Sequence, residues 1–212
     1  MNPEDSDNSK NSVWSEKELE LVSHVEIFQN KPTILKNVEQ RLIILQKELE
    51  KEITNISSKL PDEIDLIKNQ IARGENHNGF PFLSLDYPQN FSKTEMFTMR
   101  TLFWWGHYLG FSLILKGRFF STYVERLIEN CQREQLKNIY VSITPDPWEW
   151  EITDENFLLV SHLKNGDLQK KVYCLNYLKF IRVFPIKNQN FKNLNWPKEG
   201  VQFWSDLLPL LI

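Results

Sequence analysis

Residues 101–117 read TLFWWGHYLGFSLILKG, and this stretch decides the fold. The uncharged run between Arg100 and Lys116 is shorter than the ~20 predominantly apolar residues of a membrane-spanning helix. His107 near its centre would be costly in lipid. As a water-surrounded helix the run would be apolar on nearly every side. We therefore interpret it as an interior segment of a soluble protein.

The apolar residues of this stretch alternate with a second, more polar set, which is the two-residue period of a β-strand. The apolar set is Phe103, Trp105, His107, Leu109, Phe111, Leu113 and Leu115. The second set is Arg100, Trp104, Tyr108, Ser112 and Lys116. Gly106 interrupts the alternation, and glycine inside a strand often marks a bulge or a bend. The sequence predicts one long central strand that bends near Gly106.

Four residues of the second set suggest a ligand-binding face. Arg100, Trp104, Tyr108 and Ser112 would share one side of the predicted strand. An arginine beside aromatic rings could hold a carboxylate or a planar ligand. The alternative is that the rings pack beneath helices and that Arg100 pairs with a neighbouring acid.

The part of the chain before residue 76 has the three- and four-residue spacing of helices. Ser15 and Glu18 form a capping box at the start of the first helix. A second helix carries an apolar stripe at Leu35, Val38, Leu42, Leu45 and Leu49. Too many apolar positions for one domain to cover would favour a homodimer through these N-terminal helices. Residues 1–13 are polar and are predicted to be a disordered tail.

Residues 76–212 are predicted to be mostly strands with a C-terminal helix. A second capping box, Ser92 and Glu95, predicts a short helix, and WEWEI at 148–152 alternates like a half-buried strand. Asn165-Gly166 predicts a hairpin turn, and Trp196-Pro197 opens the last helix. We predict a single α+β domain over 14–212, helical to residue 75. It contains a mainly antiparallel sheet of about six strands, packed against long N-terminal helices and the C-terminal helix.

The composition disfavours several classes of partner. The chain has 212 residues, a formal net charge of −3 and two cysteines in no metal-binding or redox spacing. A mildly acidic chain lacks the basic surface that a nucleic acid requires, so we expect no nucleic-acid or membrane partner. The N-terminus has neither the basic start nor the apolar segment of a signal peptide. We expect a cytoplasmic protein.

No common catalytic or cofactor motif is present, and we expect neither a metal nor a cofactor. The remaining polar candidates are His107, Asp86 before Tyr87-Pro88, and the acids around the WEWEI stretch. Asp86 and Asp146 have the positions of residues that cap turns. Glu149 and Glu151 have those of a strand's solvent-facing side, although paired carboxylates could also share a proton.

One segment resembles a known group of proteins. Phe97-x-Met99-Arg100-Thr101-x-Phe103-Trp104-Trp105-Gly106, preceded by Leu85-Asp86-Tyr87-Pro88, is similar to a family of bacterial proteins of unknown function. The resemblance covers about residues 80–117. It implies a soluble bacterial protein and implies no activity.

The sequence leads to two functional hypotheses. The first is a non-enzymatic module that binds a small molecule or another protein with its aromatic, Arg-bearing sheet face. The second is an enzyme for a small molecule, with Asp86, Arg100, His107 or Tyr108 meeting in a pocket.

Overall fold

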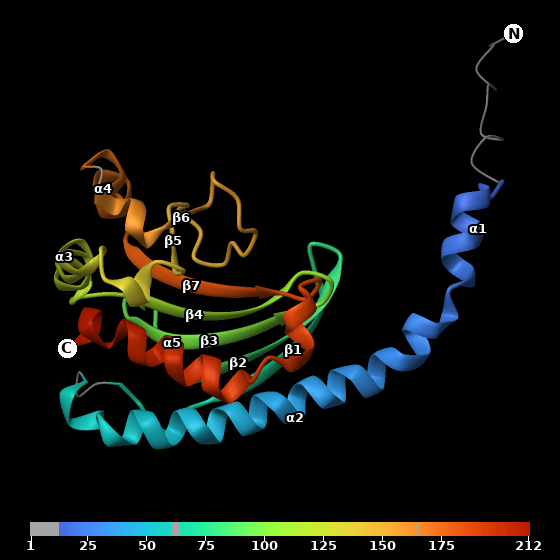
Figure 1. Cartoon of the computed structure of the whole chain (residues 1–212), viewed down its shortest axis with the longest axis horizontal. Coiled ribbons are helices and arrows are strands. Elements are labelled where there is room, and N and C mark those ends of the chain that lie inside the picture. Colours follow the sequence, from blue (N-terminus) through green and yellow to red (C-terminus); the bar gives the residue numbers. More distant parts are fainter. Residues whose placement is uncertain (1–12, 61–63, 165) are drawn as a thin grey trace, which may run out of the picture. The chain divides into compact units, whose positions relative to one another are not determined.

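The computed structural model describes residues 13–60, 64–164 and 166–212 (Figure 1). The predicted tail at 1–12 and the turn residue Asn165 lie outside these ranges. The chain divides into two compact units, residues 1–37 and 38–212, and each unit is described by itself.

The first unit contains helix α1 (Glu16–Ser23) and the start of helix α2 (Val25–Asn55). The predicted capping box is confirmed: Ser15 Oγ accepts from Glu18 N at 3.2 Å, and Ser15 N donates to Glu18 Oε2 at 2.8 Å. Pro32 lies inside α2 and not in its first turn. No residue of α1 is buried.

The second unit is built on an antiparallel sheet, as the sequence predicts. The described residues form seven strands in the order β1-β2-β3-β4-β7-β5-β6. These are β1 (Gln70–His77), β2 (Phe80–Phe91), β3 (Met96–Trp104), β4 (Tyr108–Lys116), β5 (Tyr140–Ser142), β6 (Phe157–Leu159) and β7 (Tyr177–Pro185). With the long N-terminal helix and a C-terminal helix, the fold is α+β.

Further helical segments lie between and around the strands. They are α3 (Phe120–Asn130), α4 (Gly166–Tyr173) and the 3₁₀ turns η1 (Ser57–Lys59), η2 (Glu134–Leu136), η3 (Val160–Lys164) and η4 (Gln189–Asn193). The predicted last helix is confirmed as α5 (Trp196–Leu211), and the side chain of Asn195 caps it by accepting from Lys198 N at 3.1 Å. No helix in the described part of the chain is both long and apolar enough to cross a membrane.

The stretch at 101–117 is a hairpin and not one bent strand. Strands β3 and β4 pair along their whole length, with Trp104 opposite Tyr108. Gly106 lies in the turn between them at φ +79°, a left-handed conformation that glycine adopts without steric cost. Gly106 therefore lies at a complete reversal of the chain direction, whereas the sequence predicted only a bend within one strand.

Several other local predictions are wrong for one common reason, because tertiary pairing overrides local sequence preference. The predicted helical part ends earlier, since residues 70–77 are strand β1. The Ser92–Glu95 box closes the turn between β2 and β3, where Ser92 Oγ accepts from Glu95 N at 2.8 Å. Residues 148–152 form no strand, and helix α4 follows Asn165 where a hairpin strand was predicted.

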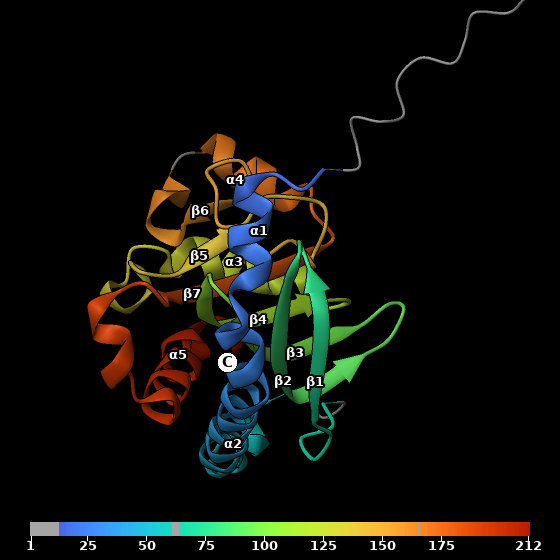
Figure 2. The ribbon, with the colours of Figure 1, turned by 90° about the vertical axis from the view of Figure 1, so that its right-hand side faces the viewer.

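One face of the sheet packs against α5 and against residues 38–55 of α2 (Figures 1 and 2). Gly200 of α5 permits this approach, because a Cβ there would lie 2.5 Å from a methyl carbon of Leu45 and 3.1 Å from the Phe111 ring. Phe97 contacts Trp204, and Phe103 stacks on Trp196. The stripe residues of this unit, Val38, Leu42, Leu45, Leu49 and Ile53, are buried. They pack within the chain and so offer no surface to a second copy.

Candidate functional site

The opposite face of the sheet carries the residues that the sequence singled out. The pairings Asp86↔Arg100, Arg100↔Ser112 and Ser112↔Ile181 set these four side chains in one row across β2, β3, β4 and β7. Trp104 and Tyr108 form a further pair on the same face. The predicted sharing of one face by Arg100, Trp104, Tyr108 and Ser112 is confirmed by this register.

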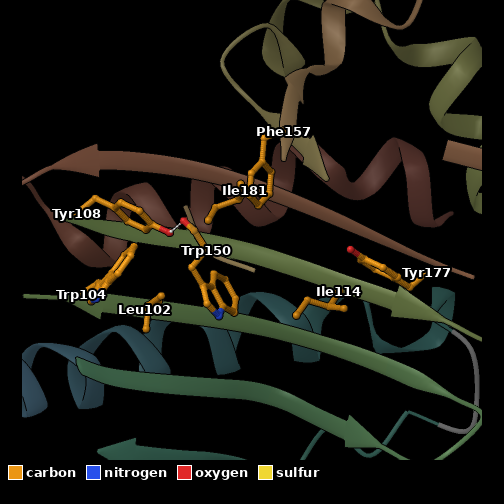
Figure 3. Close-up of a cluster of buried hydrophobic side chains, with 8 residues drawn as sticks. All are labelled: Leu102, Trp104, Tyr108, Ile114, Trp150, Phe157, Tyr177 and Ile181. Carbon is orange, nitrogen blue, oxygen red and sulfur yellow. Dashed lines mark hydrogen bonds between the residues drawn. The ribbon is translucent and has the colours of Figure 1, made fainter. Parts of the chain in front are cut away.

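This face is covered by the connection between β5 and β6, residues 143–156, which we call the strap. We call the sheet face beneath it the strap face. The strap contains no helix or strand. Trp150 of the strap is buried in a cluster with Tyr108, Ile114 and Ile181 of the sheet (Figure 3).

Side chains of the strap face hold the strap by its main chain. Tyr177 Oη donates to the carbonyl oxygen of Thr144 at 2.6 Å, and Tyr108 Oη donates to that of Trp150 at 2.6 Å (Figure 3). Lys179 Nζ donates to the carbonyl oxygens of Pro147, at 3.0 Å, and Glu149. Four carbonyl groups of an irregular segment thus find partners on the sheet, as buried backbone groups must.

Arg100 pairs with Asp86, which was the alternative that the sequence left open. Its Nε and Nη2 donate to the two carboxylate oxygens of Asp86, both at 2.7 Å, and Asp86 is 2% exposed. The guanidinium carbon lies 4.7 Å from the ring centroid of Trp148 and 5.8 Å from that of Trp150. Asp86 lies within β2 and not at a strand end, so the prediction that it caps a turn is wrong.

Lys179 is the residue of this site that sequence reasoning missed; it lies in strand β7. Its relative exposure is 0%, and Nζ lies 3.2 Å from the ring centroid of Trp150. Burial holds the pKa of Lys179 well below its ordinary value, and the charge of Arg100 lowers it further. Glu149 and Asp146 of the strap oppose this effect. A lysine at an inward position of an apolar strand was the available signal.

The two tyrosines act as fixed donors. Burial raises the pKa of Tyr108, and it raises that of Tyr177 to about 12. Tyr177 has a single proton and donates it to Thr144, so Ser142 Oγ donates to Tyr177 Oη across 3.0 Å. At neutral pH neither phenol is therefore available as a base.

His107 lies in the β3–β4 turn, just beyond the Trp104↔Tyr108 pair that ends the two strands. Its ring stacks on Trp104, with centroids 3.7 Å apart and an interplanar angle of 10°. The prediction that His107 shares the apolar face of Phe103 and Leu109 is wrong, because the turn directs its ring onto Trp104. Trp104 in turn donates from Nε1 to the carbonyl oxygen of His77 at 3.2 Å.

The remaining candidate groups are engaged in local hydrogen bonds. Ser112 Oγ donates to the carbonyl oxygen of Arg100 at 3.0 Å. Asp146 caps a turn as predicted, since its Oδ1 accepts from Trp148 N at 2.8 Å. Glu151 Oε1 accepts from Asn78 Nδ2 at 2.9 Å. No group of three or more His, Cys, Asp or Glu side chains within residues 13–60, 64–164 and 166–212 could hold a metal ion.

A second candidate surface lies on the first unit, in residues 13–34, which we call the N-terminal segment. Its exposed large apolar side chains are Val13, Trp14, Leu19, Leu21, Val22, Val25, Ile27, Phe28 and Ile34. Phe28 is 72% exposed and Val13 is 81% exposed. Apolar exposure on this scale in one segment makes it a candidate interaction surface.

Comparison of the chain with protein-family models, with curated proteins and with solved structures found no match. Any proposal about function therefore has to start from the geometry of the two surfaces.

Proposed function

We propose that this protein is a non-enzymatic interaction module that forms a homodimer through its N-terminal segment. The observation that carries the proposal is the concentration of exposed apolar side chains between Val13 and Ile34, while α1 buries none of its residues. Burying a leucine or phenylalanine side chain contributes about 1.5–3 kcal/mol. Several such side chains from each of two copies would offset the entropy that association costs.

The spacing of these residues suits helix pairing. Leu19 and Val22 lie one turn apart in α1, and Val25 and Phe28 lie one turn apart in α2. Each helix therefore presents a pair of neighbouring apolar side chains on one face. Two such faces pack together as in short helical bundles.

The charge distribution favours a second copy as the partner. Glu16, Glu18 and Glu20, with Lys17 among them, lie near the start of the segment; Lys31 lies near its end and Lys36 just beyond it. An antiparallel pairing of two copies places the acidic start of one segment opposite the basic end of the other. Such complementarity sets the orientation and the choice of partner.

The strap face gives less support to a small-molecule site or to an enzyme. Asp86 and Arg100 satisfy each other, Tyr108 donates to the strap, and His107 stacks on Trp104. A general base or a carboxylate-binding arginine requires a group that is not already engaged in this way.

Light scattering of the full chain after size-exclusion chromatography tests the dimer. We expect a mass of twice 25.3 kDa at high concentration. Phe28→Ser, alone or with Leu21→Ser, should shift the equilibrium to the monomer by about tenfold or more in dissociation constant, as expected for one or two lost apolar contacts.

Ile67→Ser is the matched control, because Ile67 is 86% exposed and belongs to the second unit. It should leave the mass unchanged. A wild-type mass of 25.3 kDa at every concentration, or a dimer that tolerates Phe28→Ser and Leu21→Ser together, refutes the proposal.

A further inference from the structure

The strap is long for the strands that support it. Strands β5 and β6 pair only at Tyr140↔Leu159, Val141↔Leu158 and Ser142↔Phe157. The connection between them runs from 143 to 156 without a helix or strand, and Figure 1 shows it looping out beside β7. Connections of this length in compact domains usually have a function of their own.

The strap face holds the backbone of the strap, which turns at Pro147 and Trp148, through side-chain donors on the sheet. Lys179, Tyr177 and Tyr108, from β7 and β4, donate to its carbonyl oxygens at positions 144, 147, 149 and 150. Main-chain hydrogen bonds of this kind supply affinity without demanding a particular sequence. A surface that uses them accepts other segments with a similar backbone path.

Two side-chain contacts define which segments would fit. Trp150 is buried against Lys179, and Trp148 lies over the guanidinium of Arg100. The carboxylates of Asp146 and Glu149 act on the charge of Lys179. Tryptophan rings beside cations, and acids near a buried ammonium group, are complementary in charge.

We propose that the strap face is a peptide-binding surface that residues 144–150 of the same chain occupy in this structure. Its ligand is a segment of a partner protein that follows the same turned backbone path and carries tryptophan and carboxylate side chains. Binding of this ligand displaces the strap. This surface belongs to the second unit and is independent of the dimer proposed for the first.

The tethered strap competes with any free peptide. A segment joined to its site by a short connection acts at an effective concentration in the millimolar range. A free peptide of equal intrinsic affinity is therefore excluded until the strap is weakened. The test must compare the intact strap with a strap that has lost its two tryptophans.

The experiment uses the full chain with Trp148→Gly and Trp150→Gly and a fluorescein-labelled peptide of sequence ITPDPWEWEIT, residues 143–153. Fluorescence anisotropy should show the peptide binding at least about tenfold more tightly to this variant than to the wild type. Adding Lys179→Met to the variant should weaken binding by about tenfold, because two hydrogen bonds to the peptide backbone are lost. Ile67→Gly is the control, because it removes an exposed apolar side chain outside the strap. It should leave the affinity for the peptide at the wild-type level.

A peptide in which serine replaces both tryptophans should not bind. If the folded double variant binds the labelled peptide no better than the wild type, or if Lys179→Met leaves its affinity unchanged, the proposal is overturned. If the double variant does not fold, hydrogen exchange of the wild type decides. Peptide added well above the millimolar effective concentration of the strap should then accelerate exchange of the non-proline amides at 144–152, and unchanged exchange there overturns the proposal.

Discussion

Asp86 and Arg100 place two opposite charges beneath the strap, where water screens them only weakly. The Asp86 carboxylate accepts two hydrogen bonds from Arg100. Lys179 has no carboxylate partner of this kind among its hydrogen bonds and donates instead to carbonyl oxygens of the strap. The Asp86–Arg100 ion pair therefore stabilises the register of β2 and β3, whereas the hydrogen bonds of Lys179 stabilise the position of the strap.

Removing Asp86 should be much more harmful than removing an exposed acid. Asp86→Ala leaves the Arg100 charge without its partner beneath the strap, and the expected loss is about 3–5 kcal/mol of unfolding free energy. Arg73→Ala is the control, because it breaks the exposed ion pair with Glu75, which is worth less than about 1 kcal/mol. Urea denaturation measures both.

The double change Asp86→Ala and Arg100→Met should recover part of this loss, because it removes the stranded charge along with its partner. A single Asp86→Ala variant as stable as Arg73→Ala would show that the buried pair contributes nothing to stability.

At the scale of elements, the β3–β4 hairpin depends on a backbone conformation that only glycine adopts easily. Gly106 has φ +79°, so Gly106→Ala should cost about 1–2 kcal/mol of unfolding free energy. Gly166→Ala, at the exposed start of α4 with open space around it, should change stability by less than about 0.5 kcal/mol. Thermal denaturation of the two variants measures the difference, and equal melting temperatures would contradict the role given to the turn.

The sequence predicted the side of the hairpin better than its path. Trp104 and Tyr108 are an even number of residues apart, so they share a face both in one strand and across a tight hairpin. The prediction that Trp104 and Tyr108 share a face is therefore correct, although the predicted direction of the chain was wrong. The reversal itself depended on Gly106, whose positive φ does not follow from its residue type alone.

The strap could not be predicted, because an extended segment alternates its side chains whether or not a neighbouring strand pairs with it. WEWEI has the pattern of a half-buried strand, and Trp150 is indeed buried while Glu151 is exposed. Its carbonyl partners, however, are side chains of β4 and β7, which lie far away in the sequence. The prediction that this stretch is a strand was wrong about hydrogen bonding. Of the two tryptophans predicted to face inward, Trp150 is buried, whereas Trp148 is 39% exposed.

At the scale of the whole molecule, buried phenols make stability sensitive to alkali. Burial raises the pKa of Tyr87 and of Tyr177 to about 12, whereas a phenol in the unfolded chain titrates near its ordinary value of about 10. Between these values the unfolded state holds fewer protons than the folded state. Stability is therefore fully present below pH ~10 and is lost as the pH rises toward 12.

Urea midpoints measured across this range should fall with pH, and Tyr177→Phe should make the fall shallower than in the wild type. Tyr173→Phe is the control, because Tyr173 is exposed. A Tyr177→Phe profile parallel to that of the wild type would contradict the assignment of this phenol.

The donors beneath the strap have a consequence for design and divergence. Lys179, Tyr177 and Tyr108 bind oxygen atoms that every amino acid carries. The side chains that point away from the sheet, such as those of Thr153, Asp154 and Glu155, do not take part in these bonds and are exposed. Exposed residues of the strap can therefore be substituted while its backbone path over the sheet is retained. The protein could in this way serve as a scaffold that displays a variable loop.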